Sequence, residues 1–180
     1  MFGLFKKKPK FESEAQHVFE RLQSHSRAPV FYEDFKIPDT LEGRFDSLTL
    51  HLFLIIHRMK ATEAGREFSQ TLFDCAFSVI DQGYRQVGIS DMGVPKRMKK
   101  LMLAFNGRLH AYDEAFEQAD KQAFAAALDK NIYNIVALEH DSRELQGLCD
   151  YAFAVMAYLG GVSDQDIING VFELPLPKLA

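Results

Sequence analysis

The sequence predicts an all-α fold, a single-domain helical bundle with an extended N-terminal arm and a proline-containing C-terminal tail. Apolar residues recur at three- and four-residue spacing in one segment after another, as on the buried faces of helices. Capping residues, prolines and glycines separate these segments. The chain has 180 residues, which suits one domain with a real core. We divide it into a basic and hydrophobic N-terminal segment (1–11), a helical domain (12–170) and an extended tail (171–180).

The N-terminal segment, MFGLFKKKPKF, mixes aromatic rings with lysines. It is expected to be disordered, and the alternative is a weak and reversible attachment to a membrane of anionic lipid. A short helix capped by Ser13 should follow and end before Pro29. Residues 27–44 are too apolar for a free linker, so we expect an ordered arm pinned across the helices, with a strand-like piece as one option.

Four longer helices should follow the arm, before a last capped helix. Asp46 or Ser47 is expected to cap SLTLHLFLIIHRMK, which is apolar nearly all round and therefore belongs in the middle of the bundle. The next helix spans 66–86. The one after it should begin with Pro95 in its first turn. The expected N-caps of these helices are Ser90 or Asp91, Asp120, and Ser142. Gly88 is expected to end one helix, and Gly160 with Gly161 to end the last long one.

The Pro95 helix carries the strongest charge cluster of a chain whose net charge is −4. No acidic residue lies between Asp91 and Asp113, and lysines crowd the helix N-terminus, where the helix dipole disfavours them. We therefore expect a solvent-exposed surface for RNA, lipid head groups or an acidic protein, with an ordinary solvated face as the alternative. Its candidate residues are Lys96, Arg97, Lys99, Lys100 and Arg108.

Some helices have more apolar residues than one buried face requires. A second stripe contains Leu50 and Phe53 on the most apolar helix, and Phe73, Phe77 and Tyr84 on the helix after it. A groove for a hydrophobic client needs exposed apolar surface, so these five are candidate client-binding residues. The alternative is a second interface within the core.

Gly107 interrupts the Pro95 helix at a cost of about 1 kcal/mol relative to alanine. A glycine there suggests close contact between helices or the close approach of a partner.

No motif typical of catalysis, of a metal site or of a cofactor site is present, so we expect no enzyme and no cofactor. His51 and His57 stand six residues apart, do not share a helix face at metal-binding spacing, and are interpreted as core-edge or hydrogen-bonding residues. Cys75 and Cys149 are interpreted as unpaired core residues. No secretory signal and no segment long enough to cross a bilayer is present, which favours the cytoplasm.

Two stretches resemble the ubiquinol–cytochrome c chaperone family, the bacterial relatives of a mitochondrial assembly factor. They are RAPVFYEDFKIPDTLEGRFDSLTLHLFLIIHRMK and QTLFDCAFSVIDQGYRQVGISDMGVPKRMKKLMLAFNGRLHAY, within a likeness that covers about 28–159. The resemblance implies an all-helical, non-catalytic chaperone that holds newly made cytochrome b for assembly of ubiquinol–cytochrome c reductase (complex III).

The same resemblance implies a place of action and partners. In the mitochondrial relatives the chaperone works at the ribosome near the inner membrane, together with a second assembly factor. The basic residues would then contact rRNA phosphates or an anionic membrane surface, and the protein would be cytoplasmic or peripheral on the inner membrane. The alternative function is a small-molecule or haem-binding helical bundle, which needs a closed apolar pocket with a ligating group such as His51.

Overall fold

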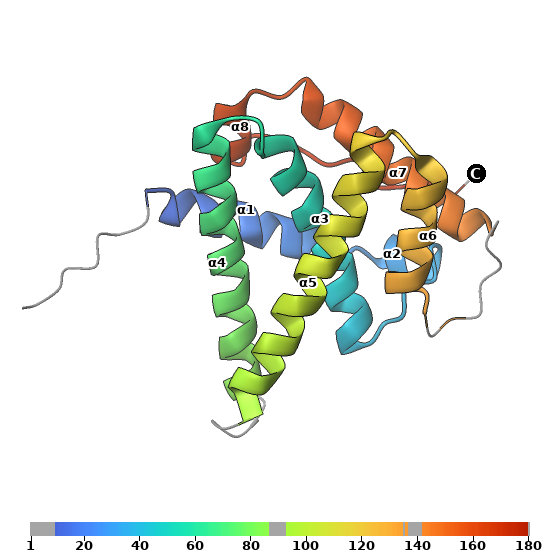
Figure 1. Ribbon diagram of the computed structural model, residues 1–180, viewed down its shortest axis with the longest axis horizontal. Coiled ribbons are helices and arrows are strands. Elements are labelled where there is room, and N and C mark those ends of the chain that lie inside the picture. Colours follow the sequence, from blue (N-terminus) through green and yellow to red (C-terminus); the bar gives the residue numbers. More distant parts are fainter. Residues whose placement is uncertain (1–9, 87–92, 135, 137–141, 180) are drawn as a thin grey trace, which may run out of the picture.

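The computed structural model describes residues 10–86, 93–134, 136 and 142–179, and within them it contains eight helices and no strand (Figure 1). The all-α prediction is therefore confirmed. The expectations for 1–9, Gly88, Ser90 and Asp91 lie outside the described residues. The helices are α1 (Glu12–His25), α2 (Pro29–Glu33), α3 (Leu41–Met59), α4 (Glu63–Gln86), α5 (Gly93–Glu117), α6 (Lys121–Ile132), α7 (Arg143–Gly160) and α8 (Asp164–Ile168).

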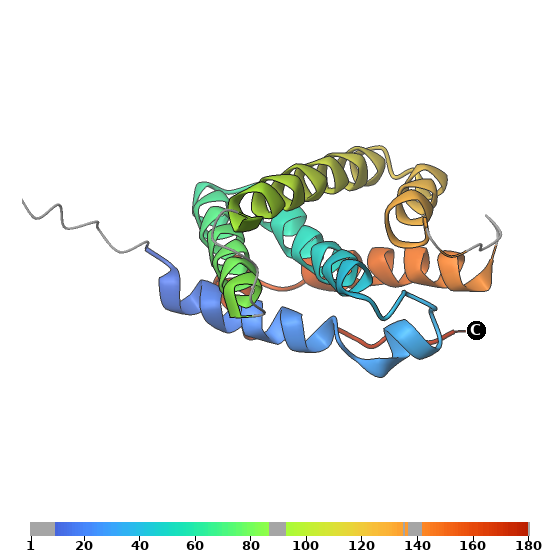
Figure 2. The same ribbon diagram turned by 90° about the horizontal axis from the view of Figure 1, so that it is seen from below.

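Helix α3 is the centre of the bundle, as its all-round apolar sequence predicts. It packs against α1, α4, α5, α6 and α7. Figure 2 shows α5 on one side of α3 and α1 with α2 on the opposite side. Leu50, Leu54 and Ile55 on α3 are fully buried. In the described part of the chain, none of the helices is both long and apolar enough to span a bilayer.

The start of α3 differs from the prediction. The helix begins at Leu41, and Thr40 caps it by accepting a hydrogen bond from Gly43 N at 3.1 Å. Asp46 and Ser47 lie inside the helix and are buried, so the prediction that one of them is the cap is wrong. Helix α1 also begins earlier than expected, at Glu12, and Ser13 is not its cap.

The arm of residues 27–44 is ordered, as predicted. Its regular element is the short helix α2, so the strand-like piece is wrong. Phe31, Phe35 and Ile37 are buried against the core, and Tyr133 donates a hydrogen bond from its hydroxyl to Phe35 O at 2.7 Å. These contacts pin the arm across the bundle.

The later caps follow the sequence rules. Asp120 caps α6 by accepting from Ala123 N, and Ser142 caps α7 by accepting from Leu145 N. Gly161 follows the last residue of α7.

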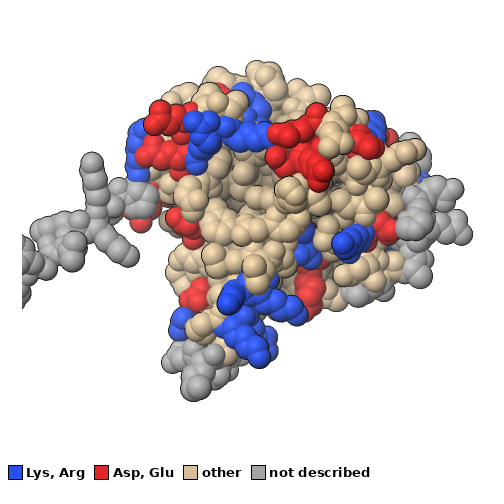
Figure 3. All heavy atoms as spheres, in the orientation of Figure 1, with Lys and Arg blue, Asp and Glu red and all other residues tan. Residues whose placement is uncertain are grey.

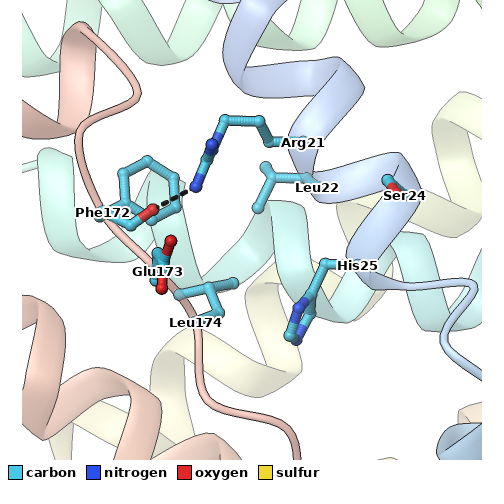
Figure 4. Close-up of a pocket in the computed structure, with 7 residues that line it drawn as sticks. All are labelled: Arg21, Leu22, Ser24, His25, Phe172, Glu173 and Leu174. Atoms are coloured by element: carbon cyan, nitrogen blue, oxygen red, sulfur yellow. Dashed lines mark hydrogen bonds between the residues drawn. The ribbon is translucent and has the colours of Figure 1, made fainter.

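The C-terminal tail is extended and lies along α1. A hollow between them is lined by residues from both, and Figure 4 shows Arg21 reaching across it to the main-chain oxygen of Phe172. The Arg21 guanidinium also lies over the Phe172 ring, 5.7 Å from its centroid. Phe172 is 6% exposed. These contacts between Arg21 and Phe172 therefore anchor the tail on α1.

Candidate functional site

Four exposed cations gather at the start of α5, and we name them the basic cluster: Lys96, Arg97, Lys99 and Lys100. Figure 3 shows cations concentrated at this end of the molecule, below a hollowed surface of uncharged residues. Among the described residues, none of the four has an acidic partner in an ion pair. The Arg97 guanidinium lies 6.0 Å from the centroid of the Tyr84 ring. The cluster is therefore free to meet external anions.

Arg108 does not belong to this surface, so its predicted exposure is wrong. Its Nη2 lies 2.7 Å from Asp46 Oδ1 on α3, and the two side chains are 15% and 8% exposed. Burial raises the pKa of Asp46 to about 7, and the nearby Arg108 charge opposes that rise. Helix periodicity placed Arg108 on the same face as Arg97 and Lys100, but α3 covers that face further along α5.

The opposite end of α5 is balanced in charge. Lys60 Nζ lies 2.7 Å from Asp113 Oδ1 and 2.7 Å from Glu117 Oε1, and His57 Nδ1 contacts Asp113 Oδ1 at 2.5 Å. Acids at a helix C-terminus are unfavourable by themselves, and here Lys60, directly after α3, supplies the compensating cation. The basic cluster at the N-terminus has no such compensation among the described residues. Stability therefore explains the acids and does not explain the basic cluster.

Three of the five candidate client-binding residues are core residues. Leu50, Phe53 and Phe77 are 0%, 1% and 7% exposed, so the expected apolar surface at these positions is wrong. They form the second core interface that was the alternative. Phe73 and Tyr84 are half-buried. They line two different hollows on two faces of α5, the helix that carries the basic cluster.

Phe73 lines a hollow of about 390 Å³ between α4 and α5, which we name the α4–α5 groove. Its apolar lining also includes Ile56, Met102, Phe105 and Leu109. Met102 is 39% exposed, and Leu103 beside it on α5 is 66% exposed. Its three- and four-residue spacing from Met98 and Phe105 predicts a buried position for Met102, and that prediction is wrong.

The sequence nevertheless contained a signal for exposed apolar residues on α5. Leu101, Met102 and Leu103 are consecutive, and consecutive residues in a helix point about 100° apart. One buried stripe cannot hold all three.

Tyr84 lines a second hollow, of about 690 Å³, which we name the α3–α5 cavity. It lies between the start of α3 and a different face of α5 from the groove. From the basic cluster, Arg97 and Lys100 line it, whereas Lys96 and Lys99 do not. The Asp46–Arg108 ion pair forms part of its wall.

The buried histidines are hydrogen-bonded within the bundle, as predicted. His51 Nδ1 donates to Ser47 O at 2.7 Å, because a carbonyl oxygen can only accept. The neutral ring then accepts at Nε2 from the Tyr151 hydroxyl at 2.9 Å, and His25 Nε2 donates to that same hydroxyl oxygen at 2.9 Å. Burial lowers the pKa of His51 to about 3. Both nitrogens of His51 are engaged, so His51 cannot ligate haem in this arrangement.

We also searched the described part of the chain for a metal site. It contains no group of three His, Cys, Asp or Glu side chains placed to hold a metal ion. Cys75 and Cys149 are unpaired, and Cys149 is buried, as predicted. Gly107 faces open space, because a Cβ added at this position would meet nothing within 4 Å, so the interpretation of close helix contact is wrong.

Comparison with known proteins shows which family and which proteins this chain is similar to. The family model described as ubiquinol-cytochrome C chaperone matches residues 33–174. The chain is 28% identical to the mitochondrial protein CBP3 of Saccharomyces cerevisiae over 158 residues, which are 83% of this chain and 45% of the yeast protein. It is 26% identical to ubiquinol-cytochrome-c reductase complex assembly factor 1 of Xenopus laevis over 139 residues, which are 77% of this chain and 68% of that protein.

A solved structure is similar over nearly the whole chain. The crystal structure of the Cbp3 homolog from Brucella abortus superimposes with a TM-score of 0.79 and 36% sequence identity, covering 96% of this chain and 94% of that one. The chain spans about half the length of the yeast, mouse and human relatives that it matches.

Proposed function

The chain belongs to the ubiquinol-cytochrome C chaperone family, and from this premise we propose that it is a non-catalytic chaperone that holds newly made cytochrome b while complex III is assembled. The names of the frog, mouse and human relatives, assembly factors of the ubiquinol–cytochrome c reductase complex, support this role. The observation that carries it is the pairing, on one helix, of exposed apolar residues with an uncompensated basic cluster.

The α4–α5 groove is our proposed client-binding surface. Cytochrome b is a membrane protein, and before insertion its apolar segments need cover from water. The groove offers Phe73 and Met102, and Leu103, the residue after Met102, is also exposed on α5. Lys60 and Arg66 stand at its polar rim. An apolar floor with a polar rim is the usual anatomy of a surface that binds a protein segment.

The basic cluster is our proposed docking surface for phosphate groups. Its four cations are exposed and have no acidic partners among the described residues. Ribosomal RNA and anionic lipid both present phosphates, and either contact would place the groove where a membrane protein is synthesised. The protein would then be peripheral on the inner membrane, and a second assembly factor would join it there.

A photo-crosslinking residue placed in the full-length protein tests the client surface. At Met102, which lines the groove, we expect a crosslink to cytochrome b in cells that are making complex III. At Val171, which is 64% exposed but lies on the tail, we expect none. Equal crosslinking at both positions, or crosslinking at Val171 alone, would contradict the proposal.

A further inference from the structure

The α3–α5 cavity shares Arg97 and Lys100 with the basic cluster, but the function proposed above assigns no ligand to it. Its wall has an apolar side and a cationic side. Leu41, Phe45 and Ile132 give it apolar surface from α3 and the end of α6. Helix α5 gives it cations, from Arg97 and Lys100 at the mouth. A purely apolar ligand would leave these cations unused, and a small inorganic anion would leave the apolar walls exposed.

Arg108 also lines the cavity, and Nη2 of its guanidinium pairs with Asp46. Its Nε is buried away from solvent. Arg97 and Lys100 are exposed, so they are the cations that can meet an acidic head group directly. A carboxylate or phosphate oxygen is the strongest acceptor for such cations.

The charges of the wall limit the charge of the ligand. Three cations line the cavity: Arg97, Lys100 and Arg108. Two carboxylates, Glu42 and Asp46, line it too. Because the pKa of Asp46 is raised to about 7, this carboxyl is only partly ionised at neutral pH, and the excess lies between one and two positive charges. That excess suits a head group with one negative charge and disfavours a polyphosphate.

The lining of the cavity favours a small amphiphile over an extended peptide. An extended peptide would need partners for its backbone N–H and C=O groups, and apolar walls supply few. The volume falls within the range of about 300–1,000 Å³ that is usual for small-molecule sites.

We propose that the α3–α5 cavity binds a single-chain amphiphile with a monoanionic head group, of the fatty-acid or lysophospholipid class. The head group lies against Arg97 and Lys100, with the charge of Arg108 on the same wall, and the alkyl chain lies against Leu41 and Phe45. The head-group contacts are charge-assisted, and the chain gains about 0.8 kcal/mol per buried methylene.

Binding of defined amphiphiles to the delipidated full-length protein, measured by calorimetry and native mass spectrometry, tests the site. The probes are palmitate, lysophosphatidylglycerol, lysophosphatidylcholine and inorganic phosphate. We expect palmitate or lysophosphatidylglycerol to bind one per chain, at least about tenfold more tightly than lysophosphatidylcholine, and phosphate not to bind measurably. The better of the two anionic probes identifies the head group as carboxylate or phosphate.

The basic cluster supplies a matched control. Arg97→Ala with Lys100→Ala should weaken binding by about tenfold or more, whereas Lys96→Ala with Lys99→Ala removes two cations that do not line the cavity and should change it by less than about twofold. Ala104→Phe, which fills the cavity from α5, should abolish binding while all cations remain. Equal losses in the two double variants, unaltered binding in Ala104→Phe, or no binding of either anionic probe would overturn the proposal. None of these results depends on cytochrome b.

Discussion

Arg108 Nη2 lies 2.7 Å from Asp46 Oδ1, and this ion pair ties the middle of α5 to the early turns of α3 away from solvent. Breaking such a pair by removing one member leaves a buried charge without compensation. We expect Asp46→Ala to lower the free energy of unfolding by about 3–5 kcal/mol, measured by urea denaturation.

Two comparisons identify the cause of that loss. Asp46→Leu combined with Arg108→Met replaces the pair with apolar side chains and should recover at least half of the lost stability. Asp39→Ala removes an acid from the exposed pair with Arg44 and should have a much smaller effect. A double variant as unstable as Asp46→Ala would show that the ion pair is not what the single change removes.

The stability of the protein should fall as the pH is lowered from about 6.5 toward 4, because of His51. Burial lowers its pKa to about 3 in the folded protein, with the charge of His25 adding to the effect. The unfolded chain therefore binds a proton in this range that the folded chain does not. The expected contribution is about 1.4 kcal/mol per pH unit.

Asp46 has the opposite sign and must be removed from the measurement. Its folded pKa of about 7 exceeds the unfolded value of 3.8, so the folded chain binds the extra proton between them, and stability is lost as the pH rises toward 7. Denaturation from pH 4.5 to 7 in an Asp46→Asn background removes this opposing contribution. Burial also lowers the pKa of His25, which adds a slope of the same sign as that of His51. Adding His51→Gln should therefore make the profile shallower, and an unchanged slope would refute the assignment to His51.

Removing the basic cluster should impair docking without unfolding the protein. Lys96, Arg97, Lys99 and Lys100 are exposed, so replacing all four with alanine should leave the circular dichroism spectrum and the midpoint of urea denaturation nearly unchanged. Binding to isolated ribosomes or to anionic vesicles should weaken, and its salt dependence should become shallower. Complex III and its cytochrome b should decrease in cells.

The control for this change removes cations that already have acidic partners. Lys10 pairs with Glu67, and Lys121 pairs with Asp150, in exposed ion pairs far from the cluster. Replacing both lysines with alanine should leave ribosome and vesicle binding unchanged. Normal cytochrome b levels in the cluster variant would contradict the docking proposal. A loss of binding to ribosomes or to vesicles shows whether the cluster contacts the phosphates of rRNA or those of lipid.

Placing a charge in the α4–α5 groove should weaken client binding. Met102 lines the groove and is 39% exposed, so Met102→Asp loses only part of its packing and should still fold. It should reduce the amount of cytochrome b that co-purifies with the protein, because an apolar segment would have to desolvate the new carboxylate. Val171→Asp, at a residue 64% exposed on the tail, is the matched control and should have no effect.

Local sequence rules predicted the helices well and the long-range electrostatics poorly. The apolar stripes of α3 and α4 and the caps at Asp120 and Ser142 depend on neighbours within a few residues, which a sequence displays directly. The partner of Arg108 is Asp46, on another helix, and no local pattern pairs them. Burial of Arg108 therefore could not be predicted from its spacing with Arg97 and Lys100.

The same limit explains the misplaced start of α3. Gly43 lies in the first turn of α3, although glycine has a low helix propensity. The structure gives a reason for this glycine, because a Cβ at position 43 would lie 2.0 Å from Pro38 O. The arm folds back on the first turn of the helix, and that contact is not visible in the spacing of the sequence.

Gly43 and Gly107 both lie within helices, and alanine should have opposite effects at the two positions. Gly107 is exposed, and a Cβ there would meet nothing within 4 Å. Gly107→Ala should therefore raise the free energy of unfolding by about 1 kcal/mol, through the higher helix propensity of alanine. Gly43→Ala should lower it, because α3 or the arm must shift to relieve the contact with Pro38. Urea denaturation of the two variants measures both changes, and a loss of stability in Gly107→Ala would contradict the open surface at that turn of α5. If Gly107→Ala is more stable yet assembles less complex III, the glycine serves the close approach of a partner to α5.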